Sequence, residues 1–257
     1  MSIDLRREGA VAIVTIDRPE KLNALDEAHY AALSDAWIEV RDDDAIRSAV
    51  ITGAGDRAFC VGADLRSYVG AERGLAEHLH TQEQLLLNRG LEVWKPIVAA
   101  VNGYCLGGGL TLLLATDLRL AAPGATFGVP EVTRGVVAAN GGTQRILRQL
   151  PHAIGMEMLL TGARIDAERA AAVGLVNRVV PAAALGDEAA ALAERIAANA
   201  PLAVQASKEL ALRSYDVDLA TGLRLEQATN RLLQGSEDVA EGKAAFAAKR
   251  EPRFRGR

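Results

Sequence analysis

The chain has few cysteines, no basic excess and no long apolar run, and each absence excludes a class of protein. Only two of its 257 residues are cysteines, too few for a disulfide scaffold and typical of a reduced, cytosolic protein. A formal net charge of -4 provides no basic face of the kind that binds nucleic acid. No apolar run approaches the roughly 20 residues that a membrane-spanning helix needs.

Signals for targeting and for metal or phosphate binding are also missing. Residues 1–4 are not part of a basic segment followed by an apolar one, so we expect no secretory signal and a cytoplasmic location. His78 and His80 lack the spacing of a helical metal pair, and no phosphate-loop or dinucleotide motif occurs. We therefore expect no metal site.

Apolar runs alternate with helix-like segments in the first two thirds of the chain. Strands are predicted at 11–16, 49–52, 97–101 and 118–121, and helices at 26–42 and 110–116. The strands are almost entirely apolar, which is typical of strands buried on both faces. This pattern predicts an α/β fold with parallel strands.

From about residue 181 onward the pattern is helical only. Helices are predicted at 183–199, 201–214, 217–234 and 237–248, with Pro201 marking a break and restart. The basic end, 249–257, is predicted to be a solvated tail, with anion binding as the alternative.

Two glycine-bearing segments, about forty residues apart, are the most informative motifs. They are Phe59-Cys60-Val61-Gly62-Ala63-Asp64-Leu65 and Asn102-Gly103-Tyr104-Cys105-Leu106-Gly107-Gly108-Gly109. Each follows a predicted strand and precedes a helix-like run, so backbone N–H groups are left unpaired at the break. One glycine after a strand only permits a turn. Two matching breaks predict an oxyanion hole, which is a pair of donors for the negative charge developing on a carbonyl oxygen.

Several strings in family order resemble the crotonase (enoyl-CoA hydratase/isomerase) superfamily over essentially the whole chain. Besides the glycine segments, they are 18–25, 127–131, 141–145, 160–162, 172–176 and 241–250. The resemblance implies a crotonase-type β-β-α spiral core, placed at residues 1–195, and a C-terminal helical trimerisation region at 196–257. It also implies acyl-CoA substrates, a homotrimer or dimer of trimers, and no cofactor beyond the coenzyme A of the substrate.

The resemblance assigns roles to individual residues. The oxyanion donors are the N–H groups of Ala63 and Gly108, and the acid/base is Glu131, with Thr111 beside it. Phe246 and Lys249 are expected to close the coenzyme A site of a neighbouring subunit. The full set expected to contact substrate is Arg18, Lys21, Leu22, Val61, Ala63, Asp64, Leu65, Arg66, Tyr104, Gly107, Gly108, Pro130, Asn140, Phe246 and Lys249. For two aspartates, Asp64 and Asp117, a structural role that fixes a loop or turn is favoured.

Thr111 is the main departure from the hydratase pattern. A family hydratase carries two glutamates, twenty residues apart, that hold one water; one acts on the water and the other handles the proton at the α-carbon. Glu131 matches the second, whereas the first falls on Thr111. A threonine can hydrogen-bond a water but cannot act as a base near pH 7.

Three readings of this departure remain. The enzyme hydrates a 2-enoyl-CoA, with Glu131 moving the proton and Thr111 positioning the water, as in family members that act on aromatic enoyl thioesters. Alternatively, Glu131 alone isomerises a 3-enoyl-CoA to a 2-enoyl-CoA. In the third reading the protein binds acyl-CoA with little catalysis. A nucleic-acid-binding protein on the same fold is a competitor from another class, which the acidic balance disfavours.

Other candidate acids are checked against the family position by position. The aspartate of dienoyl isomerases is replaced here by Ala139, which argues against that branch. Asn140 orients a water or substrate hydroxyl, or is a turn asparagine. The segment 68–94 normally shapes the acyl pocket, and most of its polar residues are expected on the solvated face of a helix. Those that could supply a second acid or base are Tyr68, Glu72, Glu77, His78, His80, Glu83 and Gln84.

Overall fold

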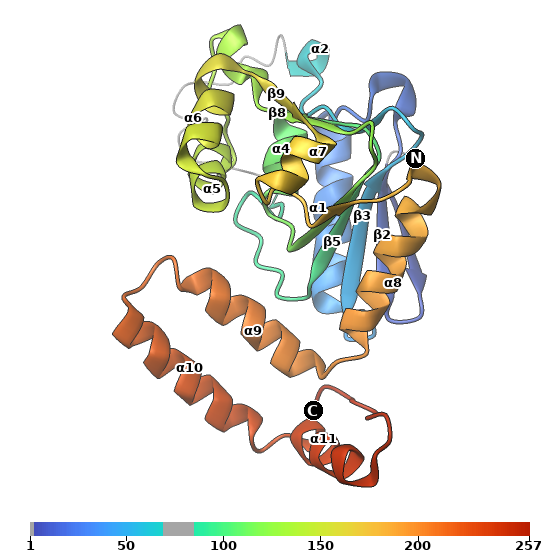
Figure 1. Cartoon of the computed structure of the whole chain (residues 1–257). Helices are drawn as coiled ribbons and strands as arrows, with labels where there is room; N and C mark the ends of the chain where they lie inside the picture. The colour runs from blue at the N-terminus through green and yellow to red at the C-terminus, as the bar shows by residue number, and fades with distance from the viewer. Residues whose placement is uncertain (1–2, 69–84) are drawn as a thin grey trace.

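A computed structural model describes residues 3–68 and 85–257. It contains a core of two sheets wrapped by helices, from which three C-terminal helices extend (Figure 1). The larger sheet has the order β1-β2-β3-β5-β7-β10. Its strands are β1 (Ile3–Glu8), β2 (Val11–Ile16), β3 (Ser48–Gly53), β5 (Ile97–Val101), β7 (Leu118–Ala121) and β10 (Arg178–Val179). All neighbours are parallel except β1 and β2, which confirms the parallel sheet predicted from the apolar runs.

The chain also forms a second, smaller sheet. Most of its strands come, along the chain, between a predicted strand and the helix that follows that strand. Its order is β4-β6-β8-β9, with only β8 and β9 antiparallel. The strands are β4 (Ala58–Cys60), β6 (Tyr104–Leu106), β8 (Thr126–Gly128) and β9 (Arg164–Asp166). In the pairs β3–β4, β5–β6 and β7–β8, the chain supplies one strand to the large sheet and then one to the small sheet before a helix. This arrangement is the expected β-β-α spiral, with the small sheet as the part that the apolar runs did not predict.

The helices cover both faces of the sheets and form the C-terminal region. They are α1 (Glu27–Asp42), α2 (Leu65–Tyr68), α4 (Gly108–Leu113), α5 (Gly142–Gln149), α6 (His152–Thr161), α7 (Ala167–Ala172), α8 (Leu185–Ala197), α9 (Pro201–Arg213), α10 (Leu219–Leu233) and α11 (Glu237–Ala248). The described part of the chain also forms three short 3-10 helices: η1 (Pro19–Lys21), η2 (Pro130–Arg134) and η3 (Ala182–Ala184). Within the described residues, no helix is both long and apolar enough to cross a membrane.

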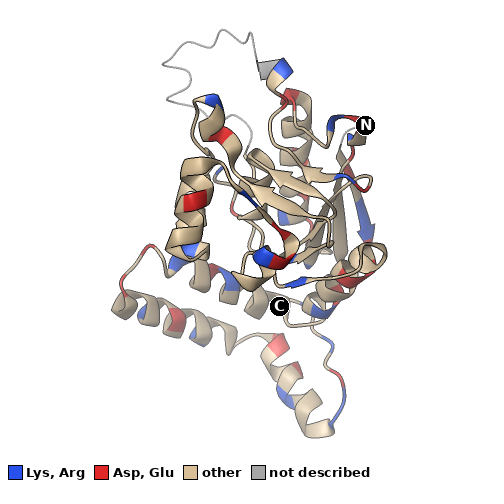
Figure 2. Ribbon diagram, turned by 45° about the horizontal axis from the view of Figure 1, so that its top comes forward, with Lys and Arg blue, Asp and Glu red and all other residues tan. Residues whose placement is uncertain are grey.

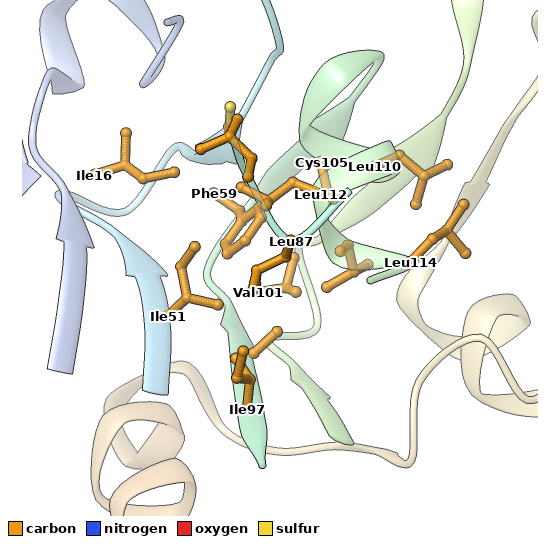
Figure 3. Packing of buried hydrophobic residues seen from close by; sticks show 14 of the residues in the cluster. Ile16, Ile51, Phe59, Leu87, Ile97, Val101, Cys105, Leu110, Leu112 and Leu114 are labelled. Carbon is orange, nitrogen blue, oxygen red and sulfur yellow. The ribbon is translucent and has the colours of Figure 1, made fainter. Parts of the chain in front are cut away.

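The main core is packed between the two sheets and α4. Figure 3 shows Ile51, Phe59, Ile97 and Leu112 converging from β3, β4, β5 and α4. Every residue of β5 is buried, as expected for a strand covered on both faces. A second cluster forms where α8 packs on the other face of the large sheet. The core therefore holds the start of α4 in a fixed position.

The basic side chains of the C-terminal end are exposed, as expected for a solvated tail, but the backbone of the tail is held against α11. The buried Asp238 carboxylate of α11 accepts hydrogen bonds from the N–H groups of Arg255 (2.6 Å) and Gly256 (2.8 Å). Glu241 binds the Arg250 guanidinium and the N–H of Arg253. Acidic and basic residues are interspersed along these C-terminal helices (Figure 2). The tail is thus fixed along α11 by carboxylates that bind its backbone.

Candidate active site

The two glycine segments meet backbone to backbone at the start of α4. Gly62 and Gly107 both have positive φ values, +88° and +55°, a region that glycine enters without steric cost. A Cβ atom added to Gly62 would lie 2.6 Å from the nitrogen of Gly108. Glycine at this position is therefore required by both the backbone conformation and the close approach of the second turn.

The N–H groups of Ala63 and Gly108 are free to bind a ligand. Leu25 pairs with the loop through the carbonyl of Gly62 and the N–H of Asp64, each at 2.8 Å, so the intervening N–H of Ala63 points away from Leu25. Gly108 is the first residue of α4, where N–H groups lack partners within the helix. Neither N–H donates to a backbone carbonyl within the described part of the chain. A Cβ on Gly108 would lie 3.6 Å from the Ala63 nitrogen, so the two donors are neighbours.

Glu131 lies against this pair of turns. It belongs to η2, and its Oε1 lies 3.3 Å from the position of a Cβ on Gly107. Its Oε2 is buried and has no hydrogen-bond partner among the described residues. Burial raises the pKa of this carboxyl above its ordinary value. A carboxyl group of this kind, next to an oxyanion hole, is suited to move a proton.

Thr111 lies one turn into α4, and its hydroxyl makes one hydrogen bond as donor and one as acceptor. Its hydroxyl donates to the carbonyl of Gly108 at 3.1 Å and accepts from the Asn88 amide at 3.0 Å. Both side chains are buried. The position of the first family glutamate is therefore occupied by a neutral, hydrogen-bonded pair.

Arg18 holds the first glycine segment in place. Its guanidinium lies 3.0 Å from the carboxylate of Asp64 and 3.2 Å from that of Asp26, and it donates to the carbonyl of Ala24. Asp64 also accepts from the N–H of Arg66. Asp64 therefore fixes the loop that follows Ala63, as the structural reading of this aspartate predicts.

Comparison with known proteins identifies the family of the chain. The family model described as enoyl-CoA hydratase/isomerase matches residues 6–257. The chain belongs to the enoyl-CoA hydratase/isomerase family. It is 44% identical to (E)-benzylidenesuccinyl-CoA hydratase of Thauera aromatica over 257 residues, covering 100% of both chains. It is 40% identical to carnitinyl-CoA dehydratase of Proteus mirabilis, covering 100% of this chain and 99% of the relative.

Solved structures of the family have the same fold. The crystal structure of enoyl-CoA hydratase from Bacillus anthracis superposes with a TM-score of 0.92 at 34% identity, and the match covers 100% of both chains. This confirms the crotonase-type fold expected from the motifs. The parallel large sheet, the small sheet and the C-terminal helices are all part of the matched chain.

The remaining residues expected at this family's substrate site fall into two groups. Near the glycine turns, Lys21 is exposed in η1, and Val61 and Leu65 flank the donor loop. The Pro130 side chain is buried at the start of η2. Tyr104 is exposed on β6 beneath the Arg164 guanidinium. Their contacts with substrate stay predictions, as does that of Leu22, which follows η1.

The second group, Phe246 and Lys249, lies away from the glycine turns and Glu131 of the same chain. Phe246 is 88% exposed on α11, and Lys249 ends that helix in a left-handed conformation. Figure 1 shows α11 at the opposite end of the molecule from α2 and α4. A role for these two residues would therefore have to be in a neighbouring subunit's site, which remains a prediction.

Asn140 adopts the left-handed turn conformation, with φ at 54°. Its carbonyl accepts from the Arg145 guanidinium at 3.0 Å. These features favour the turn asparagine over a residue that orients water.

Asn88 was not predicted from the sequence to lie at the site, yet it donates a hydrogen bond to Thr111. Glu72, Glu77, His78, His80, Glu83 and Gln84, considered as second acids, lie outside the described residues, and Tyr68 ends α2. Asn88 lies just beyond them, directly after Leu85-Leu86-Leu87. A polar residue at the end of an apolar run was the available signal, because buried amides need specific partners.

Proposed function

We propose that the protein adds water to a 2-enoyl-CoA thioester, or removes it in reverse. The observation that carries this proposal is the half-buried Glu131 side chain beside two neighbouring N–H donors; its Oε2 is buried and has no hydrogen-bond partner among the described residues. Relatives named as a hydratase and a dehydratase, each covering the whole chain, support the same reaction class.

The thioester carbonyl oxygen is placed between the N–H groups of Ala63 and Gly108. These donors stabilise the enolate that forms as the water oxygen bonds to the β-carbon and the π electrons move toward the carbonyl. Glu131, as the carboxylate, takes one proton from the water. The same carboxyl then delivers this proton to the α-carbon as the enolate collapses, which completes the addition of one water.

Isomerisation of a 3-enoyl-CoA is the second candidate, favoured by the absence of a carboxylate at position 111. Glu131 would remove a proton from the α-carbon and return it to the γ-carbon, a reaction that needs one base and the oxyanion hole. The Thr111 hydroxyl, donating to Gly108, cannot replace a second base.

One experiment separates the two candidates. A panel of 2-enoyl- and 3-enoyl-CoA thioesters, with aliphatic, aromatic and quaternary ammonium acyl groups, is incubated with the protein in deuterated water and examined by mass spectrometry. A hydratase yields a product heavier by one solvent water from a 2-enoyl substrate. Double-bond migration without water addition identifies an isomerase, and no turnover of any member contradicts both.

We further propose that α9 and α10 mediate assembly into a homotrimer or a dimer of trimers. Neither helix has a buried residue in the isolated chain. Leu219 is 78% exposed and Leu232 is 81% exposed. Large apolar side chains that are exposed together on neighbouring helices are typical of a protein–protein interface. Sedimentation equilibrium tests this, and a monomer at micromolar concentration contradicts it.

A further inference from the structure

Asn88, which contacts Thr111 at the candidate active site, has a buried side-chain oxygen without a hydrogen-bond partner among the described residues. The residue is 6% exposed, and its Oδ1 has no hydrogen-bond partner among the described residues. Buried amide oxygens in folded proteins are nearly always paired with protein groups or with ordered water. The Oδ1 of Asn88 is therefore expected to bind a group that the described residues do not supply.

The orientation of the Asn88 amide follows from its neighbour. Thr111 has one hydroxyl proton, which is directed to the carbonyl of Gly108, so its oxygen can only accept from Asn88. The amide nitrogen must then face Thr111, and Oδ1 is left as an acceptor. Thr111 Oγ1 retains one further lone pair. The pair thus offers two acceptor sites and no acid.

Packing fixes the pair. Asn88 lies in a turn closed by hydrogen bonds from the N–H groups of Arg89 and Leu91 to the carbonyl of Leu86. Leu86 and Leu87 are buried in the main core. On the other side, the methyl group of Thr111 faces Gly142, where a Cβ would approach it to 2.7 Å. These contacts leave the Thr111 hydroxyl on the side of Asn88.

We propose that Asn88 Oδ1 and Thr111 Oγ1 together hold the water that adds to the enoyl thioester, in place of the first family glutamate. This inference rests on the proposed hydratase function. One water proton goes to Glu131 and then to the α-carbon, and the water oxygen bonds to the β-carbon. The other proton remains on the new hydroxyl and is shared between Asn88 Oδ1 and Thr111 Oγ1 as one bifurcated hydrogen bond. Asn88 is therefore a water-positioning residue, and Glu131 is the base.

The test separates water placement from proton transfer. Two rates are measured for each variant: hydration of crotonyl-CoA, and exchange of the α-protons of butyryl-CoA in deuterated water. The exchange needs the oxyanion hole and Glu131 but no added water. For Asn88→Leu we expect hydration to fall by about tenfold or more, with exchange within about threefold of the wild-type rate. Thr111→Val keeps the side-chain shape and carries the same prediction, even where Asn88→Leu does not fold.

Controls and contrary outcomes complete the design. Ser48→Ala removes a buried hydroxyl that donates to the Ala193 carbonyl at 2.9 Å, away from the site, and is expected to leave both rates unchanged. Combining Asn88→Leu with Thr111→Val is expected to cost little more hydration than either change alone, because both act on one water. Unchanged hydration, or equal losses of hydration and exchange in Thr111→Val, overturns the proposal. Exchange without hydration of any 2-enoyl-CoA of the panel by the wild-type protein instead overturns the hydratase function itself.

Discussion

The sheet core and the C-terminal helices differ in how many of their side chains are buried within a single chain. Every residue of β5 is buried, and α8 buries five residues against the large sheet. In contrast, α9 and α10 bury none, although both carry leucines. The groups to which we assign chemistry lie in the sheet core and not in the C-terminal helices. They are Ala63, Gly108 and Glu131. The comparison predicts that changes in the core alter catalysis directly, whereas changes in the C-terminal helices act through assembly.

The largest expected effect is that of Glu131→Gln. Amide replacement removes the carboxylate that takes the water proton, so kcat/KM for hydration is expected to fall by about a hundredfold or more. Steady-state hydration assays measure this loss. The matched control is Glu168→Gln on the exposed face of α7, which is expected to keep full activity. Full activity in Glu131→Gln contradicts the assignment of the base.

The same substitution also separates function from stability. Burial raises the folded-state pKa of Glu131 above its ordinary value of 4.5, so the stability that its neutral form contributes is present below pH 4.5. It is lost as the pH rises through the folded-state pKa. The Gln variant does not incur this loss. Its Tm at pH 7 is therefore expected to equal or exceed that of the wild type.

Gly62→Ala is expected to have the next largest effect. The added Cβ would lie 2.6 Å from the Gly108 nitrogen at a φ of +88°, so one donor must move. Loss of an oxyanion donor typically costs on the order of a hundredfold in kcat. Gly124→Ala, which adds a Cβ into open space, is the control. Equal activity of the two variants would show that the turns are not the oxyanion hole.

Much of the core was predictable because its signals are local. The apolar strands β2, β3, β5 and β7 and the glycine turns were predicted from runs and breaks in the sequence. The strands of the small sheet are three residues each, too short to display a period. Strand β1 was missed although its burial alternates at the start. At the site, the partner of Thr111 depends on a contact across 23 positions, which local patterns do not contain.

The C-terminal helices are tested by Leu232→Glu on α10. A carboxylate at this exposed leucine would be buried in a subunit interface, which is unfavourable. Association is expected to weaken by at least about tenfold, with the monomer still folded because α10 buries no residue in its own chain. Sedimentation velocity measures the change. Ala191→Glu on the exposed side of α8 is the control, and unchanged association of Leu232→Glu would place the interface elsewhere.

The pH dependence tests the electrostatics of the core with a smaller effect. Glu131 must be ionised to act as a base, and burial raises its pKa above the ordinary value of 4.5. The loss of kcat/KM on acidification is therefore expected to have its midpoint above pH 4.5. The nearby positive charge of Arg134 opposes this shift. Arg134→Gln is therefore expected to move the acid limb of the profile to higher pH. A limb at or below 4.5 in the wild type would contradict the burial of the reacting carboxyl.

The smallest effect on catalysis is expected at the start of α11, where two adjacent acids differ in burial and in the groups that they bind. The buried Asp238 accepts two backbone N–H groups of the tail, so Asp238→Ala leaves both donors unpaired. Its exposed neighbour Glu237 only pairs with Arg257, an interaction that solvent weakens. Asp238→Ala is expected to destabilise the docked tail by about 1–3 kcal/mol, seen as faster amide exchange at Arg255 and Gly256, with kcat unchanged. Glu237→Ala should not change exchange at these two amides, and equal exchange in the two variants would show that burial does not hold the tail in place.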